Sequence, residues 1–325
     1  MGRGPRSTKR GLTETRSAAQ RFCPCDGRST IVHSGGFSVR RFYRFAVSLL
    51  LFTAALHAQS HNRRFLMWKV SSPTATVYLV GSIHLADPSI FPLPEPVEHA
   101  FAESKVLAVE ADVNNFNPEE AIGLLGEYGL YSDGDSLSKH LSSETSHQLD
   151  DFCSKHSLPR DLLETMKPWM VALLVESSAA QESGFSPDSG IDMHFLHEAE
   201  GQRVDQLESI EFQFKLLGSA SDSEQQEFLS GALKGADDIG QTERSYESGD
   251  VAALESEISK QEPRSYYQRL IDDRNPAMTD KVAAYLDGHE TVFVVVGIAH
   301  VIGDNGIAKS LERRHFNVEQ HSYSW

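Results

Sequence analysis

Two histidines, each three residues after a glycine that ends an apolar run, carry the strongest chemical signal in this sequence. Residues Thr76–His84 read TVYLVGSIH, and residues Thr291–His300 read TVFVVVGIAH. Such β-branched and aromatic runs predict buried strands, and open α/β sheets bind their ligands beyond the carboxyl ends of strands. Imidazole is a common ligand of zinc, manganese and cobalt and also a usable general base. We therefore predict that His84 and His300 form one site, although each alone could cap a strand in the core.

A carboxylate follows a third predicted strand in the same way. Glu110 comes directly after the apolar run Val106–Val109, so its side chain also lies at a strand terminus. If the strands before His84 and Glu110 are parallel neighbours, as a β-loop-helix-β unit implies, both residues reach one edge of the sheet. Two histidines and one carboxylate are a familiar metal set with positions left for water or substrate. Asp112 faces the same side if the chain stays extended, and the alternative for it is a turn acid.

Other residues of the right chemical type fit a structural role at least as well. His194, His197 and Glu198 share one face of a predicted helix, but their spacing matches neither His-Glu-x-x-His nor His-x-x-Glu-His. A solvated acidic helix explains them equally well. Cys153 lies on a predicted helix and is interpreted as partly buried and inert. The sequence contains no Gly-x-Ser-x-Gly elbow, P-loop or Gly-x-Gly-x-x-Gly fingerprint, so serine hydrolase and nucleotide-binding functions lose their main support.

The elements that must position these residues cluster as strands at both ends of the sequence, with helices between them. Strands are predicted at 65–70 and 76–80, which form a hairpin, and at 106–109, 203–207, 291–296 and 316–319. Helices are predicted at 97–104, 118–128, 144–156, 160–166, 168–182, 190–200, 209–217, 222–234, 250–261, 264–272, 276–287 and 307–314. We therefore predict an α/β fold with a central, mostly parallel or mixed sheet built from both chain ends. A large helical insertion at about 117–290 would interrupt a single domain of residues 59–325.

Charge is distributed unevenly along the 325 residues, whose net charge is −16. Residues 1–58 contain ten Lys or Arg and two acidic residues, so residues 59–325 retain 20 basic and 44 acidic residues, a net of about −24. Such an acidic body repels nucleic acid and anionic membranes, which argues against a DNA- or RNA-binding function. The ordinary hydrophobic content of 40% is that of a globular protein.

The basic front end has the features of an export signal. Three arginines in 40–44 precede the apolar segment 45–56, and Ala58 precedes a polar start. The segment is short for a membrane-spanning helix, which needs about 20 residues. We predict a leader at 1–58, with a start assigned upstream of the signal peptide and cleavage after Ala58. The product would be periplasmic or secreted with no stable membrane span, and a retained anchor is the alternative.

Several short motifs follow one another in a fixed order. After the first Gly-x-x-His motif come PLP at 92–94 and EAD at 110–112, then KPWM at 167–170, GID at 190–192 and LES at 207–209 with Gln213. Arg274 and Asn275 and the second Gly-x-x-His motif complete the series. In this order and spacing, the motifs resemble the TraB/GumN family, which includes the Tiki proteases, over about residues 65–320. The bacterial GumN-like branch is the most similar.

The resemblance implies a fold akin to the erythromycin-esterase and ChaN-like proteins, with both Gly-x-x-His motifs in one cleft. Tiki members are described as metal-dependent peptidases that use manganese or cobalt, and zinc also suits imidazole ligands. Carried over by position, His84, Glu110 and His300 would be metal ligands or lie close to them. Arg274 would match the family's arginine, where a guanidinium could bind a substrate carboxylate or stabilise an oxyanion. A salt bridge to Asp272, Asp273 or another acid is the alternative for Arg274.

These observations lead to the expectation of an exported metal-dependent hydrolase, in the first place a peptidase. A divalent metal would lower the pKa of bound water and polarise the scissile carbonyl, with Glu110, Asp112 and Arg274 as the catalytic residues. The substrate would be a peptide or a small molecule. The competing hypothesis is a non-catalytic protein that binds a metal, haem or a peptide signal in the same cleft. The sequence leaves the substrate and the oligomeric state open.

Overall fold

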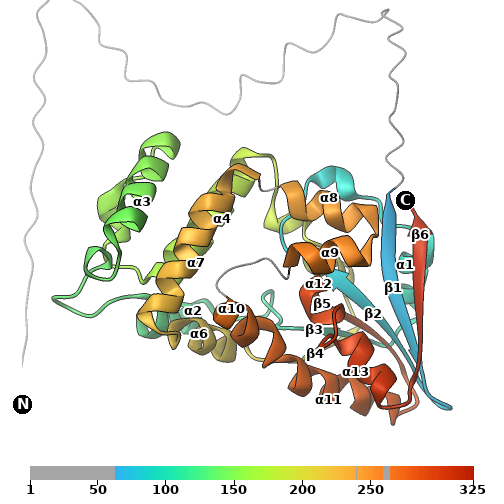
Figure 1. Cartoon of the computed structure of the whole chain (residues 1–325). Coiled ribbons are helices and arrows are strands. Elements are labelled where there is room, and N and C mark those ends of the chain that lie inside the picture. Colours follow the sequence, from blue (N-terminus) through green and yellow to red (C-terminus); the bar gives the residue numbers. More distant parts are fainter. Residues whose placement is uncertain (1–62, 239, 259–263) are drawn as a thin grey trace, which may run out of the picture. The chain divides into compact units, whose positions relative to one another are not determined.

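Parallel strands with histidines and a glutamate at their carboxyl ends form the centre of the structure, a computed structural model (Figure 1). It describes residues 63–238, 240–258 and 264–325. The predicted leader and its cleavage site lie outside these residues and stay predictions. No helix in the described part of the chain is long and apolar enough to cross a membrane.

The described strands form one six-stranded sheet in the order β4-β3-β5-β2-β1-β6. The four strands β4, β3, β5 and β2 run parallel, and β1 and β6 add an antiparallel pair at one edge. The strands are β1 (Arg64–Ser71), β2 (Thr76–Ser82), β3 (Val106–Val109), β4 (Arg203–Gln206), β5 (Thr291–Gly297) and β6 (Asn317–Ser324). The predicted mixed sheet from both chain ends is confirmed.

The predicted adjacency of β2 and β3 is wrong, but the actual strand order still brings the predicted ligands to one edge of the sheet. The strands before His84 and Glu110 are not neighbours, because β5 lies between β2 and β3 and pairs in parallel with both. The inserted strand is the one that leads to His300. All three strands run parallel, so their carboxyl ends still share one edge, and three adjacent strands deliver the three predicted ligands.

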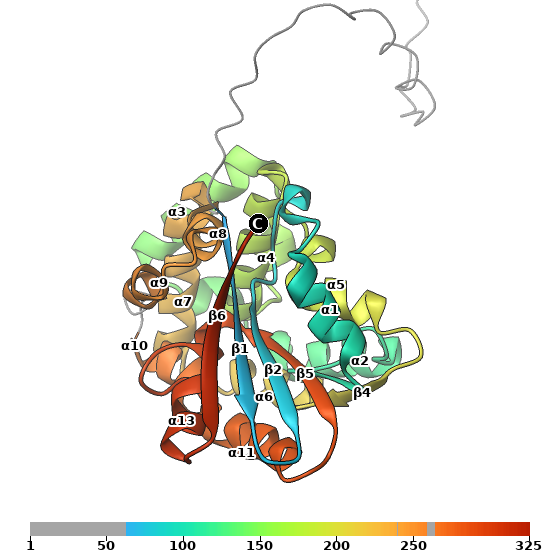
Figure 2. The ribbon, with the colours of Figure 1, turned by 90° about the vertical axis from the view of Figure 1, so that its right-hand side faces the viewer.

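Helices cover both faces of the sheet. Figure 2 shows α1 and α5 on one side of the strands and α8, α9 and α13 on the other. The helices are α1 (Glu95–Glu103), α2 (Pro118–Leu124), α3 (Ser143–His156), α4 (Pro168–Glu182), α5 (Ile191–Glu198), α6 (Ile210–Gly218), α7 (Asp222–Gly235), α8 (Gly240–Ser248), α9 (Val251–Ile258), α10 (Arg264–Tyr267), α11 (Asn275–Leu286), α12 (Ile298–Val301) and α13 (Ile307–Arg313). A π-helical turn, Gln268–Asp272, joins α10 to α11.

Aromatic packing fixes the strands that carry the site. Phe293 in β5 lies 5.4 Å from Phe101 of α1 and 4.6 Å from Phe195 of α5, measured between ring centroids. All three rings are buried. A second apolar cluster lies among α3, α4 and α7 and includes Leu149, Val175 and Leu229. The helical middle of the chain thus has a core of its own, separate from the one that holds the sheet.

The predicted helical middle is confirmed, with local differences. Helix α4 has the predicted bounds, whereas the helix predicted at 160–166 is a single turn, Arg160–Leu163. Helix α8 was not predicted, because GQTERSYES is polar throughout and buries only Glu243 and Tyr246. The last predicted strand is longer than 316–319, because β6 pairs with β1 along its whole length. Its exposed edge gives it little apolar patterning.

Candidate active site

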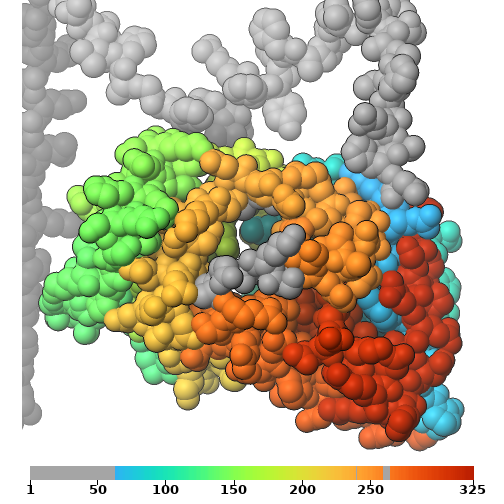
Figure 3. All heavy atoms as spheres, viewed as in Figure 1, coloured from blue at the N-terminus to red at the C-terminus, as the bar shows by residue number. Residues whose placement is uncertain are grey.

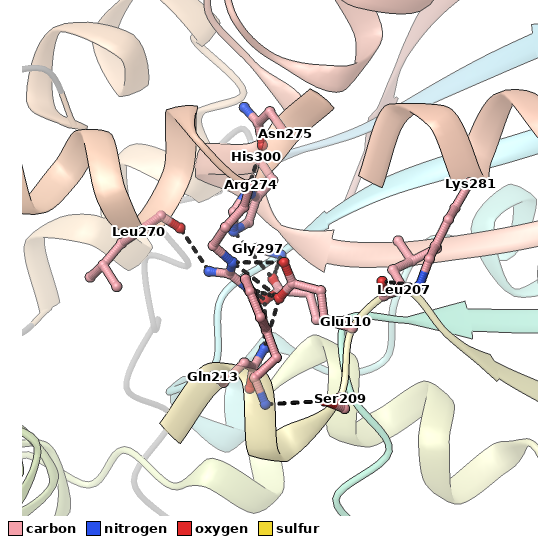
Figure 4. Close-up of polar contacts among 12 residues, drawn as sticks. Glu110, Leu207, Ser209, Gln213, Leu270, Arg274, Asn275, Lys281, Gly297 and His300 are labelled. Atoms are coloured by element: carbon pink, nitrogen blue, oxygen red, sulfur yellow. Dashed lines mark hydrogen bonds and ion pairs between the residues drawn. The ribbon is translucent and has the colours of Figure 1, made fainter. Parts of the chain in front are cut away.

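Glu110 is the centre of the polar cluster at the carboxyl edge of the sheet (Figure 4). Its Oε1 accepts a 2.7 Å hydrogen bond from the Gly297 N–H, and its Oε2 lies 2.7 Å from Nη2 of Arg274 and 3.3 Å from Nε2 of Gln213. His300 Nε2 lies 3.8 Å from Oε1. Burial raises the pKa of Glu110, but the positive neighbours and the Gly297 N–H outweigh it and lower that pKa to about 2. A carboxylate so acidic is a weak base and suits a ligand or anchoring role.

His300 is held as a neutral imidazole with its lone pair turned to Glu110. Its Nδ1 lies 2.6 Å from Oδ1 of Asn275, whose Nδ2 donates to the Asn305 carbonyl oxygen at 2.9 Å. A carbonyl oxygen only accepts, so this bond fixes the Asn275 amide and makes His300 Nδ1 the donor. Burial lowers the pKa of His300 to about 4. Nε2 therefore carries a free lone pair, as a metal ligand requires.

His84 is held by the opposite means, through a negative partner. Its Nδ1 lies 3.1 Å from Oδ1 of Asp192, and 61% of its side chain is exposed. The Ser82 hydroxyl donates to the same Asp192 oxygen at 2.5 Å, and Ser82 Oγ accepts from the Asp192 N–H at 3.0 Å. The Asp192 carboxylate raises the pKa of His84 to about 9. With Nδ1 directed at Asp192, Nε2 is the nitrogen left for a ligand or substrate.

The two glycines of the Gly-x-x-His motifs make room for this arrangement. A methyl group added at Gly297 would lie 3.3 Å from Glu110 Oε1, 3.4 Å from His84 Nε2 and 3.7 Å from His300 Cδ2. All three predicted ligands therefore surround one point at the end of β5. A methyl group at Gly81 would lie 2.2 Å from the side chain of Ile298, the residue after Gly297. Each glycine thus permits the close approach of the other motif.

Arg274 is clamped by two glutamates, one of which sequence reasoning left out of the site. Glu208 accepts from Arg274 Nε at 3.0 Å and from Nη2 at 2.6 Å, and its N–H donates to the Glu110 carbonyl oxygen at 2.7 Å. The Arg274 Nη1 donates to the Leu270 carbonyl oxygen at 2.7 Å. The signal for Glu208 was the LES motif, which was noted only as part of the resemblance. The salt-bridge alternative for Arg274 is also present, with Glu110 and Glu208 as its partners.

Asp112 is not brought into the cluster by its described contacts. Its Oδ1 accepts from the N–H groups of Asn114 at 3.1 Å and Asn115 at 3.2 Å, and its Oδ2 accepts from Asn115 Nδ2 at 2.7 Å. The chain turns after Glu110 instead of staying extended. Asp112 therefore caps a turn, as its alternative interpretation holds, and a catalytic role for it stays a prediction.

The residues interpreted as structural occupy structural positions. His194 Nε2 lies 2.9 Å from Glu98 Oε1, and His197 and Glu198 are exposed, so this trio does not converge. Cys153 is a buried free thiol whose pKa is raised by burial. Asp192, Asn275, Gln213 and Glu208 are the residues that sequence reasoning did not place in the site. All four occur in the series of short motifs, whose chemistry a sequence alone does not reveal.

The imidazole nitrogens of His84 and His300 and the carboxylate of Glu110 are suitable ligands for a divalent cation. They are not, however, close enough together to form a complete metal site. In the described parts of the chain, no group of three or more His, Cys, Asp or Glu residues is arranged to hold a metal ion. Ligands about 2.1 Å from a tetrahedral metal lie about 3.4 Å apart, close to the 3.8 Å between His300 Nε2 and Glu110 Oε1. Both histidines have Nδ1 held by an oxygen partner, the usual outer-shell arrangement of metal-bound imidazole. The residues present therefore fit a metal in chemistry and direction.

A family model and two relatives match this chain. The model of the TraB/PrgY/gumN family matches residues 66–320. The protein named Uncharacterized protein YbaP from Escherichia coli (strain K12) is 24% identical over 239 residues, which cover 72% of this chain and 87% of YbaP. The protein of the same name from Shigella flexneri matches to the same extent. No solved structure matches significantly.

Proposed function

This chain belongs to the TraB/PrgY/gumN family, and from that premise we propose that it is an exported metal-dependent hydrolase that acts on peptides. The observation that carries the proposal is the matched support of the two histidines. Each has its Nδ1 held by an oxygen partner, Asp192 or Asn275, and its Nε2 left available beside Glu110. A purely structural pair of histidines has no need of this convergence.

His84, His300 and Glu110 would hold the metal, with manganese or cobalt favoured and zinc compatible. When bound, a divalent cation supplies an activated water and polarises a carbonyl group. Glu110 contributes a carboxylate that stays ionised across the physiological pH range, because its pKa is about 2. His84 lies at the exposed side of the cluster and, without a metal, carries a proton at neutral pH because its pKa is about 9.

Arg274 acts mainly as an anchor for Glu110 in this proposal. Its described contacts with Glu110, Glu208 and the Leu270 carbonyl occupy four of the five N–H groups of a guanidinium. One Nη1–H is left for a substrate oxygen. The extra negative charge of Glu208 balances Arg274, so the guanidinium does not make the site repel a cation.

A second candidate function, non-catalytic binding, is supported by the contacts that Glu110 and Asp112 already make. Glu110 is a weak base with both oxygens engaged, and Asp112 caps a turn. Neither is a ready general base for hydrolysis. The same cleft in a non-catalytic protein would bind a metal, haem or a peptide signal. Turnover of any peptide that depends on the metal would exclude this alternative.

The test begins with metal analysis of the purified protein, followed by digestion of a peptide library with and without chelator. We expect one manganese or cobalt ion per chain and cleavage that chelator abolishes. His197→Ala is a matched control, because His197 is an exposed histidine outside the cluster. Metal content and cleavage that are unaffected by His84→Ala would contradict the proposal.

Export forms a separate part of the proposal and has its own test. The basic-then-apolar segment before Ala58 supports removal of the leader. N-terminal sequencing of the protein from an expressing bacterium should yield a chain that begins near Gln59. A cytoplasmic product that retains the apolar segment 45–56 would refute the export proposal.

A further inference from the structure

Helix α8 lies outside the candidate active site, yet both of its buried side chains bond to the segment that carries His84. Of the nine residues of α8, only Glu243 and Tyr246 are buried. The Tyr246 hydroxyl donates to the Gly81 carbonyl oxygen at 2.8 Å, and Glu243 Oε1 accepts from the Asp87 N–H at 2.9 Å. Gly81 precedes His84 by three residues, and Asp87 follows it by three. The two bonds therefore hold the backbone on both sides of this histidine.

The position of His84 depends on its backbone more than the position of His300 does. The side chain of His84 is largely exposed, whereas that of His300 lies in the core. An exposed imidazole stands where its backbone places it, so the bond between His84 and Asp192 requires a fixed loop. The pairing of β2 with β1 ends at Val80. The Tyr246 hydroxyl therefore binds β2 one residue beyond the point where strand pairing on that side stops.

Helix α8 is itself anchored to the sheet by contacts that do not involve the site. The Tyr246 ring packs edge-on against Phe65 of β1, with centroids 5.9 Å apart. Figure 3 shows the orange atoms of α8 and α9 beside the blue atoms of β1. Glu247 of α8 pairs with Arg63, which directly precedes β1, at 3.0 Å, and α9 buries Leu254 in the core that holds the sheet. The helix therefore provides a fixed support for the loop.

The same pair of helices contacts the second motif only at the surface. The Gly303 N–H, three residues after His300, donates to Glu255 Oε1 of α9 at 3.0 Å, and this bond is exposed. An exposed bond competes with water, whereas a buried group that loses its partner stays unsatisfied. We propose that Tyr246 and Glu243 are positioning residues that hold His84 in place for the metal, a role that rests on the function proposed above. Helix α8 supports the first motif and not the second.

The first measurement is the manganese affinity of the whole protein, by isothermal titration. Tyr246→Phe removes one hydroxyl and keeps the ring, and Glu243→Ala removes one acceptor. We expect each to raise the Kd about tenfold, the lower end of the 10–100-fold that loss of an outer-shell partner costs. Glu243→Gln should restore the affinity, because the amide oxygen of glutamine accepts the same bond from the Asp87 N–H.

Ser104→Ala is the matched control. The Ser104 hydroxyl is buried and donates to the Ala100 carbonyl oxygen at 2.8 Å, the same kind of bond at the same distance as that of Tyr246. It lies before the amino end of β3, whereas Glu110 follows the carboxyl end. Ser104→Ala and Tyr246→Phe should both lower the thermal midpoint, but only Tyr246→Phe should raise the Kd for manganese.

The second measurement is made without metal, so it does not depend on the proposed function. NMR spectra of the metal-free protein record the ring resonances of His84 and His300, which His84→Gln and His300→Gln assign. Tyr246→Phe and Glu243→Ala should shift the His84 resonances and leave those of His300 in place. Ser104→Ala should shift neither.

The two measurements separate the positioning role from the hydrolase. His84 resonances that do not shift in Tyr246→Phe and Glu243→Ala would overturn the positioning role, and so would equal shifts at His300. A Kd for manganese that is unchanged in both variants, or raised as much by Ser104→Ala, would also overturn it. If the unaltered protein binds no metal but the His84 resonances alone shift, the hydrolase fails and the support of His84 by α8 stands.

Discussion

The two Gly-x-x-His motifs have nearly the same sequence but opposite electrostatic environments. His84 is largely exposed, with a charged partner in Asp192 and a pKa raised to about 9. His300 has a side chain that is 3% exposed, a neutral amide partner in Asn275 and a pKa lowered to about 4. The first motif continues into an irregular loop, and the second continues into the short helix α12.

The difference separates what the motif itself determines, the position of the imidazole, from what distant residues determine, its protonation state. Gly-x-x-His after a strand determines where the imidazole stands, because three parallel strands end at one edge. The protonation state comes from the outer partner and from burial, both supplied by segments far away in the sequence. A buried neutral histidine is a ready ligand, whereas an exposed protonated one must lose a proton before it can bind a metal. We infer that His300 anchors the metal and His84 completes its coordination from the solvent side.

The largest effect should come from removing the negative charge of Glu110, which lies beside both histidines. Glu110→Gln leaves no cavity but removes the negative charge of a predicted metal ligand. We therefore expect kcat/KM for a cleaved peptide to fall by about 100-fold or more, beyond the 10–100-fold that loss of an outer-shell partner costs. The measurement is made at saturating metal. Asp112→Asn is the comparison variant and should have a far smaller effect, because Asp112 contacts its own turn. Near-normal turnover in Glu110→Gln would make the binding protein the better account.

Substituting Asp192 or Asn275, the residues that hold Nδ1 of His84 and of His300, should affect the two histidines separately. Asp192→Asn takes the charged partner from His84, and Asn275→Ala takes the amide from His300. Each should weaken manganese affinity by about 10–100-fold, but only Asp192→Asn should also lower the pKa of a ligand. Affinity in Asp192→Asn should therefore vary less with pH between 7 and 9. Isothermal titration over that range distinguishes the variants, and identical pH profiles would contradict the assignment of partners.

The two glycines should separate folding from binding. A methyl group in Gly81→Ala would lie 2.9 Å from the Ile298 backbone, so we expect a loss of about 1–3 kcal/mol in the free energy of unfolding. In Gly297→Ala the added methyl group lies 3.3–3.7 Å from atoms of the three predicted ligands. This variant should fold and lose metal affinity. Urea unfolding and metal titration of both variants would refute the account if Gly297→Ala proved the less stable of the two.

The smallest effect is a difference in how pH alters stability. The pKa of His84 is raised above its unfolded value of about 6.5, so its contribution is full below that pH and is lost as pH rises to about 9. The pKa of His300 is lowered, so its contribution is full above pH 6.5 and is lost as pH falls to about 4. Each amounts to at most about 1.4 kcal/mol per pH unit, and less for exposed His84 because solvent screens it.

Urea midpoints from pH 4 to 9 in chelator test this prediction. The difference between the unaltered protein and His84→Gln should shrink toward pH 9. The difference from His300→Gln should shrink toward pH 4. Parallel trends for the two variants would show that the motifs share one environment.

The sequence was sufficient for the parts of the fold that depend on local pattern. The β-branched runs placed β2, β3 and β5, and the glycines after them placed the histidines. The insertion of β5 between β2 and β3 depends on pairing over more than 180 residues, which no local pattern records. The same holds for the Asp192 carboxylate and the Asn275 amide, which become partners of His84 and His300 only in the fold. The bonds from Asn114 and Asn115 to Asp112 depend on a turn that the strand pattern before Glu110 does not record. The catalytic role of Asp112 stays a prediction.

The most direct test of the shared site is the manganese stoichiometry of the unaltered protein, His84→Ala and His300→Ala. Equilibrium dialysis with elemental analysis gives it without any assumption about the substrate, and circular dichroism confirms that each variant is folded. We predict one ion per chain in the unaltered protein, with affinity lost in both variants and more severely in His300→Ala. Unchanged stoichiometry and affinity in both variants would contradict the claim that the two motifs build one metal site.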